Sequence, residues 1–225
     1  MLSLSSLYHN ASYLQRCQDT IDLALATHPR LMAVRIDLHF PNNELAADTK
    51  AITRFIDSLK AKLKANRQRK KKEDPDKRVH DTSLFYIWVR EVGEQSERAH
   101  YHLVLMLNKD AFCSVGDFKA NPADKHERPS LFVMACQAWC SALKLEAVKN
   151  NASLVHFPQN PWYWLKLDER NSTDYKGFLE RVSYLAKDRT KIYSKAARSF
   201  GCSAGGKRYH VMRWKLQQER IERQL

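Results

Sequence analysis

Two histidines, His100 and His102, are separated by one residue at the start of a strongly apolar stretch, HYHLVLMLN. Residues two apart on a β-strand point to the same face, so this spacing aims both imidazoles at one point. Two adjacent imidazoles are a common part of a divalent metal site. The alternative is a pair of half-buried sheet histidines. The basic chain and a Tyr-Lys helix at residues 175–191 favour the metal site.

Glu91 is the expected third ligand, because it lies near the end of a second apolar stretch, SLFYIWVREV (residues 83–92). An antiparallel hairpin of residues 83–92 and 100–108 brings its carboxylate close to the two histidines. Glu91 also shares its strand face with an apolar row, and a buried carboxylate must be paired or coordinated. A mixed imidazole and carboxylate set suits Mg²⁺ or Mn²⁺ acting on phosphate oxygens, and Zn²⁺ also accepts it.

Tyr184 and Lys187 lie three residues apart in YKGFLERVSYLAKDRTK (residues 175–191), so both fall on one face of the expected helix. Lys191 extends the same stripe. A phenol ionises near pH 10, so a tyrosine that attacks phosphorus needs a nearby cation or metal to stabilise the phenolate. Lys187 and the expected metal can stabilise the phenolate and polarise the phosphate, which makes Tyr184 a candidate nucleophile.

The alternative for this helix is structural, with Tyr184 packed against the sheet and Lys187 in solvent. Tyr175 and Tyr193 are each nine residues from Tyr184 and therefore point about 180° away from it. If the helix is catalytic, a mechanism with a single tyrosine follows.

Charge gives a separate indication of the partner, because 38 Lys+Arg against 25 Asp+Glu leave a formal net charge of +13. Such a surface attracts polyanions, above all nucleic acid. The densest cations are candidate phosphate contacts, with a solvated helix end as the alternative. They are Lys60, Lys62, Lys64, Arg67, Arg69, Lys70, Lys71 and Lys72. The aromatic residues 162–164 could stack on bases, but core or lid packing is the commoner use of such residues.

The elements that must position these residues follow from hydrophobic periodicity. Helices are expected at residues 12–26, 44–72, 130–146 and 174–193, strands at 31–41, 83–92, 100–108 and 154–157, and a loop at 160–164. In the first strand Arg35, Asp37 and His39 share the face opposite the apolar row. The order predicts an α+β fold, a largely antiparallel central sheet covered by helices, in one domain.

Five scattered cysteines indicate neither a disulfide framework nor a zinc knuckle. The first residues lack a signal-peptide pattern, and no run of 18 apolar residues occurs. We therefore expect a cytoplasmic protein of a bacterial host with no membrane partner.

Four stretches together resemble the replication-initiator branch of the His-hydrophobe-His (HUH) endonucleases, most closely the inovirus gene-two-like replication proteins of phages and prophages. They are MAVRIDLHFP (32–41), WVREVGE (88–94), AHYHLVLMLN (99–108) and VSYLAKDRTK (182–191). The resemblance covers residues 30–202, an HUH-type nicking domain of RRM-like architecture. Residues 1–29 then form a helical extension and residues 203–225 a basic tail, expected to be helical.

The resemblance implies rolling-circle initiation, in which one DNA strand is nicked and the enzyme stays joined to it through a 5′-phosphotyrosine. His100 and His102 become metal ligands, Tyr184 the nucleophile and Lys187 its helper. Related single-tyrosine transposases place the third ligand four residues after the nucleophile, so Asp188 is the reserve to Glu91. Tyr101 stands where related families often have a smaller residue.

The implied partners are single-stranded or hairpin origin DNA and a host helicase or polymerase. Two other functions stay open on the sequence alone. One is a single-tyrosine transposase with the same chemistry on another substrate, and the other is a non-catalytic, basic nucleic-acid-binding regulator.

Overall fold

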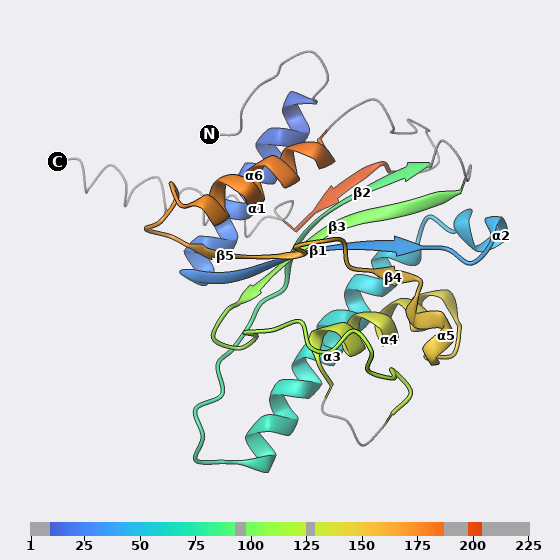
Figure 1. Ribbon diagram of the computed structural model, residues 1–225, viewed down its shortest axis with the longest axis horizontal. Helices are drawn as coiled ribbons and strands as arrows, with labels where there is room; N and C mark the ends of the chain where they lie inside the picture. Colours follow the sequence, from blue (N-terminus) through green and yellow to red (C-terminus); the bar gives the residue numbers. More distant parts are fainter. Residues whose placement is uncertain (1–9, 93–97, 125–128, 187–197, 204–225) are drawn as a thin grey trace.

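A six-stranded antiparallel sheet forms the centre of the computed structural model, which describes residues 10–92, 98–124, 129–186 and 198–203 (Figure 1). The strand order is β4-β1-β3-β2-β6, and β5 pairs with the same edge of β1 as β4. Helices cover the sheet, which confirms the predicted α+β class. The strands are β1 (Arg30–His39), β2 (Phe85–Val92), β3 (Ala99–Asn108), β4 (Val155–His156), β5 (Trp162–Lys166) and β6 (Phe200–Cys202).

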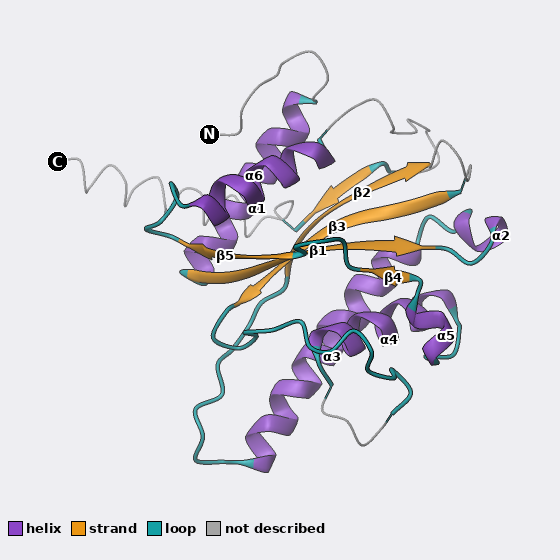
Figure 2. Ribbon diagram, in the orientation of Figure 1, coloured by secondary structure: helices purple, strands orange, loops and turns teal. Residues whose placement is uncertain are grey.

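The helices lie in two layers, one on each face of the sheet (Figure 2). On one face lie α1 (Ala11–Thr27) and α6 (Thr173–Leu185), and on the other lie α3 (Ala51–Glu73) and α4 (Leu131–Leu143). Two short helices, α2 (Asn43–Ala46) and α5 (Lys149–Ala152), lie in connections. The sheet therefore has two separate apolar faces to cover, and each has its own pair of helices.

The core beneath α3 and α4 forms from the alternate residues of the central strands that the sequence placed on one face. Ile36 and Leu38 of β1 and Leu103 and Leu105 of β3 pack there against the apolar stripe of α3. Trp139 of α4 is fully buried and donates from its indole Nε1 to the carbonyl of His39 at 2.8 Å. This bond ties α4 to the end of β1.

The second core, beneath α1 and α6, uses the opposite set of strand residues. Ile87 and Val89 of β2 and Val104 and Met106 of β3 all face this layer. His100 and His102 share parity with Val104, so they lie on this face too, beyond the end of the apolar row.

The strand register determines which polar residues meet at that end of the sheet. Asp37 of β1 is directly opposite His102, and His39 is opposite His100. On the other side of β3, Glu91 is directly opposite His100. The predicted hairpin of β2 and β3 is confirmed.

Several element boundaries differ from the sequence prediction. The expected helix at 44–72 is two helices, because the Asp48 carboxylate accepts from the backbone N–H of Lys50 and closes a turn between α2 and α3. Residues 162–164, expected as a loop, begin β5, where Tyr163 packs in one core and Trp164 in the other. The partner of β5 is the distant edge of β1 at Arg30–Val34, so local sequence does not reveal the pairing. β6 was not predicted, and three residues are too few to show alternation.

The expected domain division at residue 29 stays a prediction. In the structure α1 packs against the sheet, and Cys17, Ile21, Ala24 and Leu25 are fully buried in the same core as β2 and β3. Within the described residues, no helix is both long and apolar enough to cross a membrane. The basic tail at 203–225 lies almost wholly outside the described residues.

Candidate metal centre

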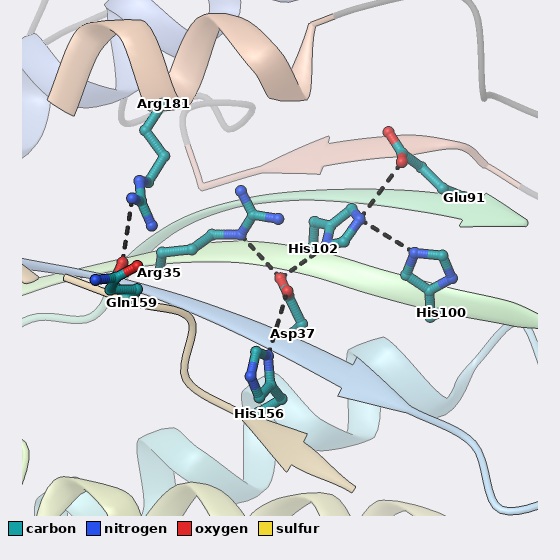
Figure 3. A network of polar contacts seen from close by, with 8 residues as sticks. All are labelled: Arg35, Asp37, Glu91, His100, His102, His156, Gln159 and Arg181. Atoms are coloured by element: carbon teal, nitrogen blue, oxygen red, sulfur yellow. Dashed lines mark hydrogen bonds and ion pairs between the residues drawn. The ribbon is translucent and has the colours of Figure 1, made fainter. Parts of the chain in front are cut away.

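Glu91, His100 and His102 come together at one end of the sheet, on the face covered by α1 and α6 (Figure 3). The hairpin register places Glu91 beside His100, and the two-residue spacing places His102 on the same face. The His100 and His102 side chains are half-buried, whereas Glu91 is only 4% exposed. The Glu91 carboxylate is therefore inside the protein, where it needs a charged or polar partner.

The geometry of these three side chains fits a divalent ion. One ligand atom from each lies within 4.8 Å of the others. His100 Nε2 is 3.1 Å from His102 Nε2, which is 3.4 Å from Glu91 Oε2. Donors bound to one ion at about 2.1 Å are about 3.0–3.4 Å apart at tetrahedral or octahedral angles. These two separations match that range, so the three side chains form a candidate divalent metal site.

Asp37 holds His102 from the side opposite the candidate metal. The His102 Nδ1–H donates to Asp37 Oδ1 at 2.6 Å, and the Arg35 guanidinium donates to the same oxygen at 2.8 Å. Arg35 and Asp37 are 8% and 9% exposed. With its Nδ1 proton committed to Asp37, His102 presents Nε2 toward Glu91 and His100, which is the orientation that a metal ligand needs.

The ionisation of these groups follows from their contacts. Burial opposes the charge of Asp37, but the hydrogen bond from His102 and the charge of Arg35 outweigh it and lower the pKa of this carboxyl to about 2. Burial also disfavours charged His102, yet its bonds to Asp37 and Glu91 raise its pKa above 6.5. Burial and the charge of His102 lower the pKa of His100. The pair therefore holds its first proton mainly on His102.

Two more histidines extend the site to the edge of the sheet. His156 on β4 is opposite Asp37, with Nδ1 3.8 Å from Asp37 Oδ2, and the His39 ring stacks on the His100 ring with centroids 5.6 Å apart. Both are exposed. With His100 and His102 they bring four imidazoles together at this end of the sheet.

Tyr184 lies in the last turn of α6 and is 45% exposed. α6 covers the sheet face that carries the metal centre, and its Arg181 lies above that face in Figure 3. Arg181 donates to the carbonyl of Gln159 at 3.3 Å and lies over the Tyr163 ring, which holds α6 to the β4–β5 connection. Lys187, Asp188 and Lys191 lie outside the described residues.

The predicted basic run lies on α3, which belongs to the other face of the sheet (Figure 1). Part of it is engaged within the protein. Arg67 pairs with Asp81, Arg69 pairs with Glu73, and the Lys62 ammonium donates to Gln137. Lys60, Lys64, Lys70, Lys71 and Lys72 are exposed. The structure thus separates the basic run from the metal centre.

Comparison with known proteins gives the family. The sequence model of the YagK/YfjJ C-terminal domain matches residues 6–203. The chain belongs to the YagK/YfjJ C-terminal domain family. It is 40% identical to Escherichia coli K12 YagK over 189 residues, which cover 78% of this chain and 84% of YagK. It is 38% identical to YfjJ of the same strain over 209 residues, covering 88% of this chain and 96% of YfjJ.

Both relatives are uncharacterized proteins, so membership of the YagK/YfjJ family brings no activity with it. No solved structure matches the chain. The likeness to HUH endonucleases stays a prediction.

The sequence placed Arg35, Asp37 and His39 on one face of β1 but gave them no role in the site. A usable signal was present in the sequence, because Arg35 and Asp37 are charged residues within a strongly apolar strand, and buried strands seldom carry charges. A buried carboxylate on such a strand needs a fixed cationic or imidazole partner. Local sequence could not predict that this partner is His102, 65 residues later.

Proposed function

We propose that this YagK/YfjJ family member is a metal-dependent enzyme that nicks and rejoins single-stranded DNA through Tyr184. The observation that carries the proposal is the cluster of Glu91, His100 and His102, with Asp37 fixing the orientation of His102. Support for the nucleophile comes from the position of Tyr184, on the helix that covers the same sheet face. The formal charge of +13 favours a nucleic acid as substrate.

In the proposed reaction the Tyr184 oxygen attacks a phosphodiester phosphorus. The new bond joins Tyr184 Oη to phosphorus, and the bond from phosphorus to the 3′ oxygen breaks. The phenolic proton passes to solvent, the leaving 3′ oxygen gains a proton, and the product is a 5′-phosphotyrosine with a free 3′-OH. A bound Mg²⁺ or Mn²⁺ would polarise the phosphate and stabilise the charge that develops on its oxygens.

The other residues of the chain position the reacting groups. Asp37 and Arg35 keep His102 Nε2 directed at the ion, and Glu91 supplies the negative charge that two neutral imidazoles lack. Lys187 is the proposed stabiliser of the tyrosine oxygen. Rejoining is the reverse reaction, with a 3′-OH as the attacking group.

The biological setting that we propose is rolling-circle replication of a phage or prophage element. A nick that leaves a 3′-OH gives a host polymerase a primer, and the covalent tyrosine bond stores the energy for closing the displaced strand. A single-stranded or hairpin origin and a host helicase are the partners that this setting needs.

The test is incubation of the protein with 5′- or 3′-labelled single-stranded DNA, with Mn²⁺ or with EDTA, followed by a denaturing gel. We expect a covalent protein–DNA adduct that needs Mn²⁺ and disappears in Tyr184→Phe. Tyr163→Phe is the matched control, because Tyr163 also lies on this side of the sheet and should keep the adduct. If the native protein forms no adduct across a broad panel of hairpins and still binds them, a non-catalytic regulator replaces the enzyme.

A further inference from the structure

A groove runs between α3 and residues 74–84, on the side of the sheet opposite the metal centre. Its larger part has a volume of about 550 Å³ and lies between the last turns of α3, residues 77–82 and residues 110–112. A second hollow of about 430 Å³ continues it along α3 as far as Lys60. Both parts share Leu63, Arg67 and Thr82 in their lining, so they lie next to each other along α3 and are together called the groove. From Lys60 to Lys70 it follows α3 for about 15 Å.

Among the charged residues that line this groove, more cations than carboxylates are left outside ion pairs within the protein. Three of its four acidic residues already have arginine partners: Asp81 pairs with Arg67, Glu73 with Arg69 and Asp110 with Arg30, which leaves Asp74 as the one lining carboxylate outside these ion pairs. The cations differ in this respect. Throughout the described ranges, no carboxylate lies within 4.0 Å of the charged groups of Lys60, Lys64, Lys70, Lys77 and Arg78. The groove therefore presents cationic groups to an incoming ligand.

The shape and chemistry of the groove select a phosphate backbone over other anionic partners. Its apolar floor is already covered, because Leu63, Leu84 and Phe112 are 4%, 8% and 9% exposed. A protein partner normally gains its affinity from a buried apolar centre, and these three side chains leave little exposed surface to form one. Several lysines along one groove can instead contact successive phosphates and release their counterions.

The position of the groove separates it from the candidate chemistry. The metal centre is at the start of β3, whereas Asp110–Phe112 follow its end at Asn108 (Figure 1). His102 and Asn108 are about 20 Å apart along the strand, and the two sites lie on opposite faces of the sheet. A DNA duplex held in the groove is therefore about six base pairs or more from the reacting phosphate, at about 3.4 Å for each base pair.

We infer that this groove is a second nucleic-acid site, which binds the phosphate backbone of DNA flanking the substrate strand and takes no part in bond breaking. Because its ligand is a polyanion, the site needs no metal and no reactive tyrosine. It would hold the protein on DNA while the other face of the sheet engages the strand to be cut. The inference uses DNA as the partner in the proposed function but does not depend on nicking.

The test measures DNA binding without chemistry, on the Tyr184→Phe protein in EDTA with a 30-base-pair duplex of random sequence. The groove variant is Lys64→Gln/Lys77→Gln/Arg78→Gln, and the control is Lys50→Gln/Lys119→Gln/Lys149→Gln. Both remove three exposed positive charges, and the control lysines lie outside the groove. We expect the slope of log K against log salt to fall in magnitude by about 2–3 in the groove variant and by less than 1 in the control.

Equal slopes and affinities in the two variants would overturn the inference, because only net charge would then matter. Competition by polyglutamate as effective as that by DNA, at equal charge, would also overturn it. Thermal unfolding of both variants checks that the fold is kept. Since adduct formation is measured in a separate assay, binding through the groove without any adduct would contradict the proposed enzyme and leave this inference standing.

Discussion

The hydrogen bond between His102 and Asp37 decides which nitrogen of His102 faces the other candidate ligands. Asp37 accepts from Nδ1 at 2.6 Å while Arg35 donates to the same carboxylate oxygen, so Asp37 is held between two partners. Its pKa of about 2 keeps it charged at every pH above about 4. A charged Asp37 both orients the imidazole and makes Nε2 more basic, which strengthens a metal bond.

Asp37→Asn should therefore weaken Mn²⁺ binding by about 10–100-fold while leaving the three candidate ligands in place. Loss of the negative charge should also lower the pKa of His102, because the hydrogen bond to Asp37 is what raises it most. Isothermal titration with Mn²⁺ measures the first effect, and an NMR titration of the imidazoles measures the second. Asp57→Asn on the exposed side of α3 is the control. Unchanged affinity in Asp37→Asn would show that the charge of Asp37 does not strengthen metal binding through His102.

The pH dependence of metal binding follows from the same residue. A metal binds the neutral imidazole, so protonation of His102 competes with it, and the raised pKa places this competition above pH 6.5. We expect Mn²⁺ affinity to fall about tenfold per pH unit below the pKa of His102 and to level off above it. In the metal-free protein, the stability of the fold changes with pH in the opposite direction. The contribution of His102 to stability is present below pH 6.5 and is lost as pH rises through its folded pKa. Titrations between about pH 5.5 and 8.5 would contradict this if affinity rose on acidification.

At the scale of elements, the edge strand β6 pairs with β2, the strand that carries Glu91, so that β2 has a neighbour on each side. β6 pairs with β2 at Ile87, Trp88 and Val89, and the indole of Trp88 lies across Gly201. A Cβ at position 201 would lie 2.6 Å from Trp88 Nε1, inside contact distance. The missing side chain is what lets β6 pair beneath the indole.

Gly201→Ala should lower the free energy of unfolding by about 1–3 kcal/mol through this overlap. Gly177→Ala is a matched substitution that should instead raise the free energy of unfolding. Gly177 is inside α6, the nearest atom to its added Cβ would be Tyr163 Cε1 at 3.4 Å, and alanine in a helix interior is favoured by about 0.5–1 kcal/mol. Urea unfolding of both variants measures the difference. A Gly201→Ala protein as stable as the native one would mean that β6 does not pack on Trp88.

For the molecule as a whole, the sheet joins two cores, and α1 belongs to one of them. Ile21 is fully buried in a core that also contains residues of β2 and β3, and these two strands contribute to the other core as well. Because the same strands form part of both cores, disruption of one core should destabilise the other. We expect residues 11–186 to unfold together rather than with α1 as a separate extension.

Ile21→Ala should accordingly destabilise the entire domain by about 2–5 kcal/mol in a single transition. Leu167→Ala, at a site 42% exposed, is the control and should stay within about 0.5 kcal/mol. Thermal unfolding followed by both far-UV and near-UV circular dichroism measures whether the transitions coincide. A variant that lost only helical signal at low temperature, with its tertiary signal intact, would show that residues 1–29 are a separate unit after all.

The sequence by itself determined the fold class, the β2–β3 hairpin and the face of each central strand. These features follow from local periodicity, since alternation in a strand and the 3.6-residue repeat in a helix record which side is buried. For the same reason the spacing of Glu91, His100 and His102 was enough to predict that all three share one face of the hairpin.

Only the tertiary structure decided what lies across from these residues. The pairing of Asp37 with His102, the addition of β5 and β6 to the sheet edges, and the placement of the basic run on the far face all join segments distant in the chain. Such contacts depend on the register between strands and on which face each helix covers. Neither is encoded in the spacing of neighbouring residues, because many registers and coverings satisfy the same local pattern.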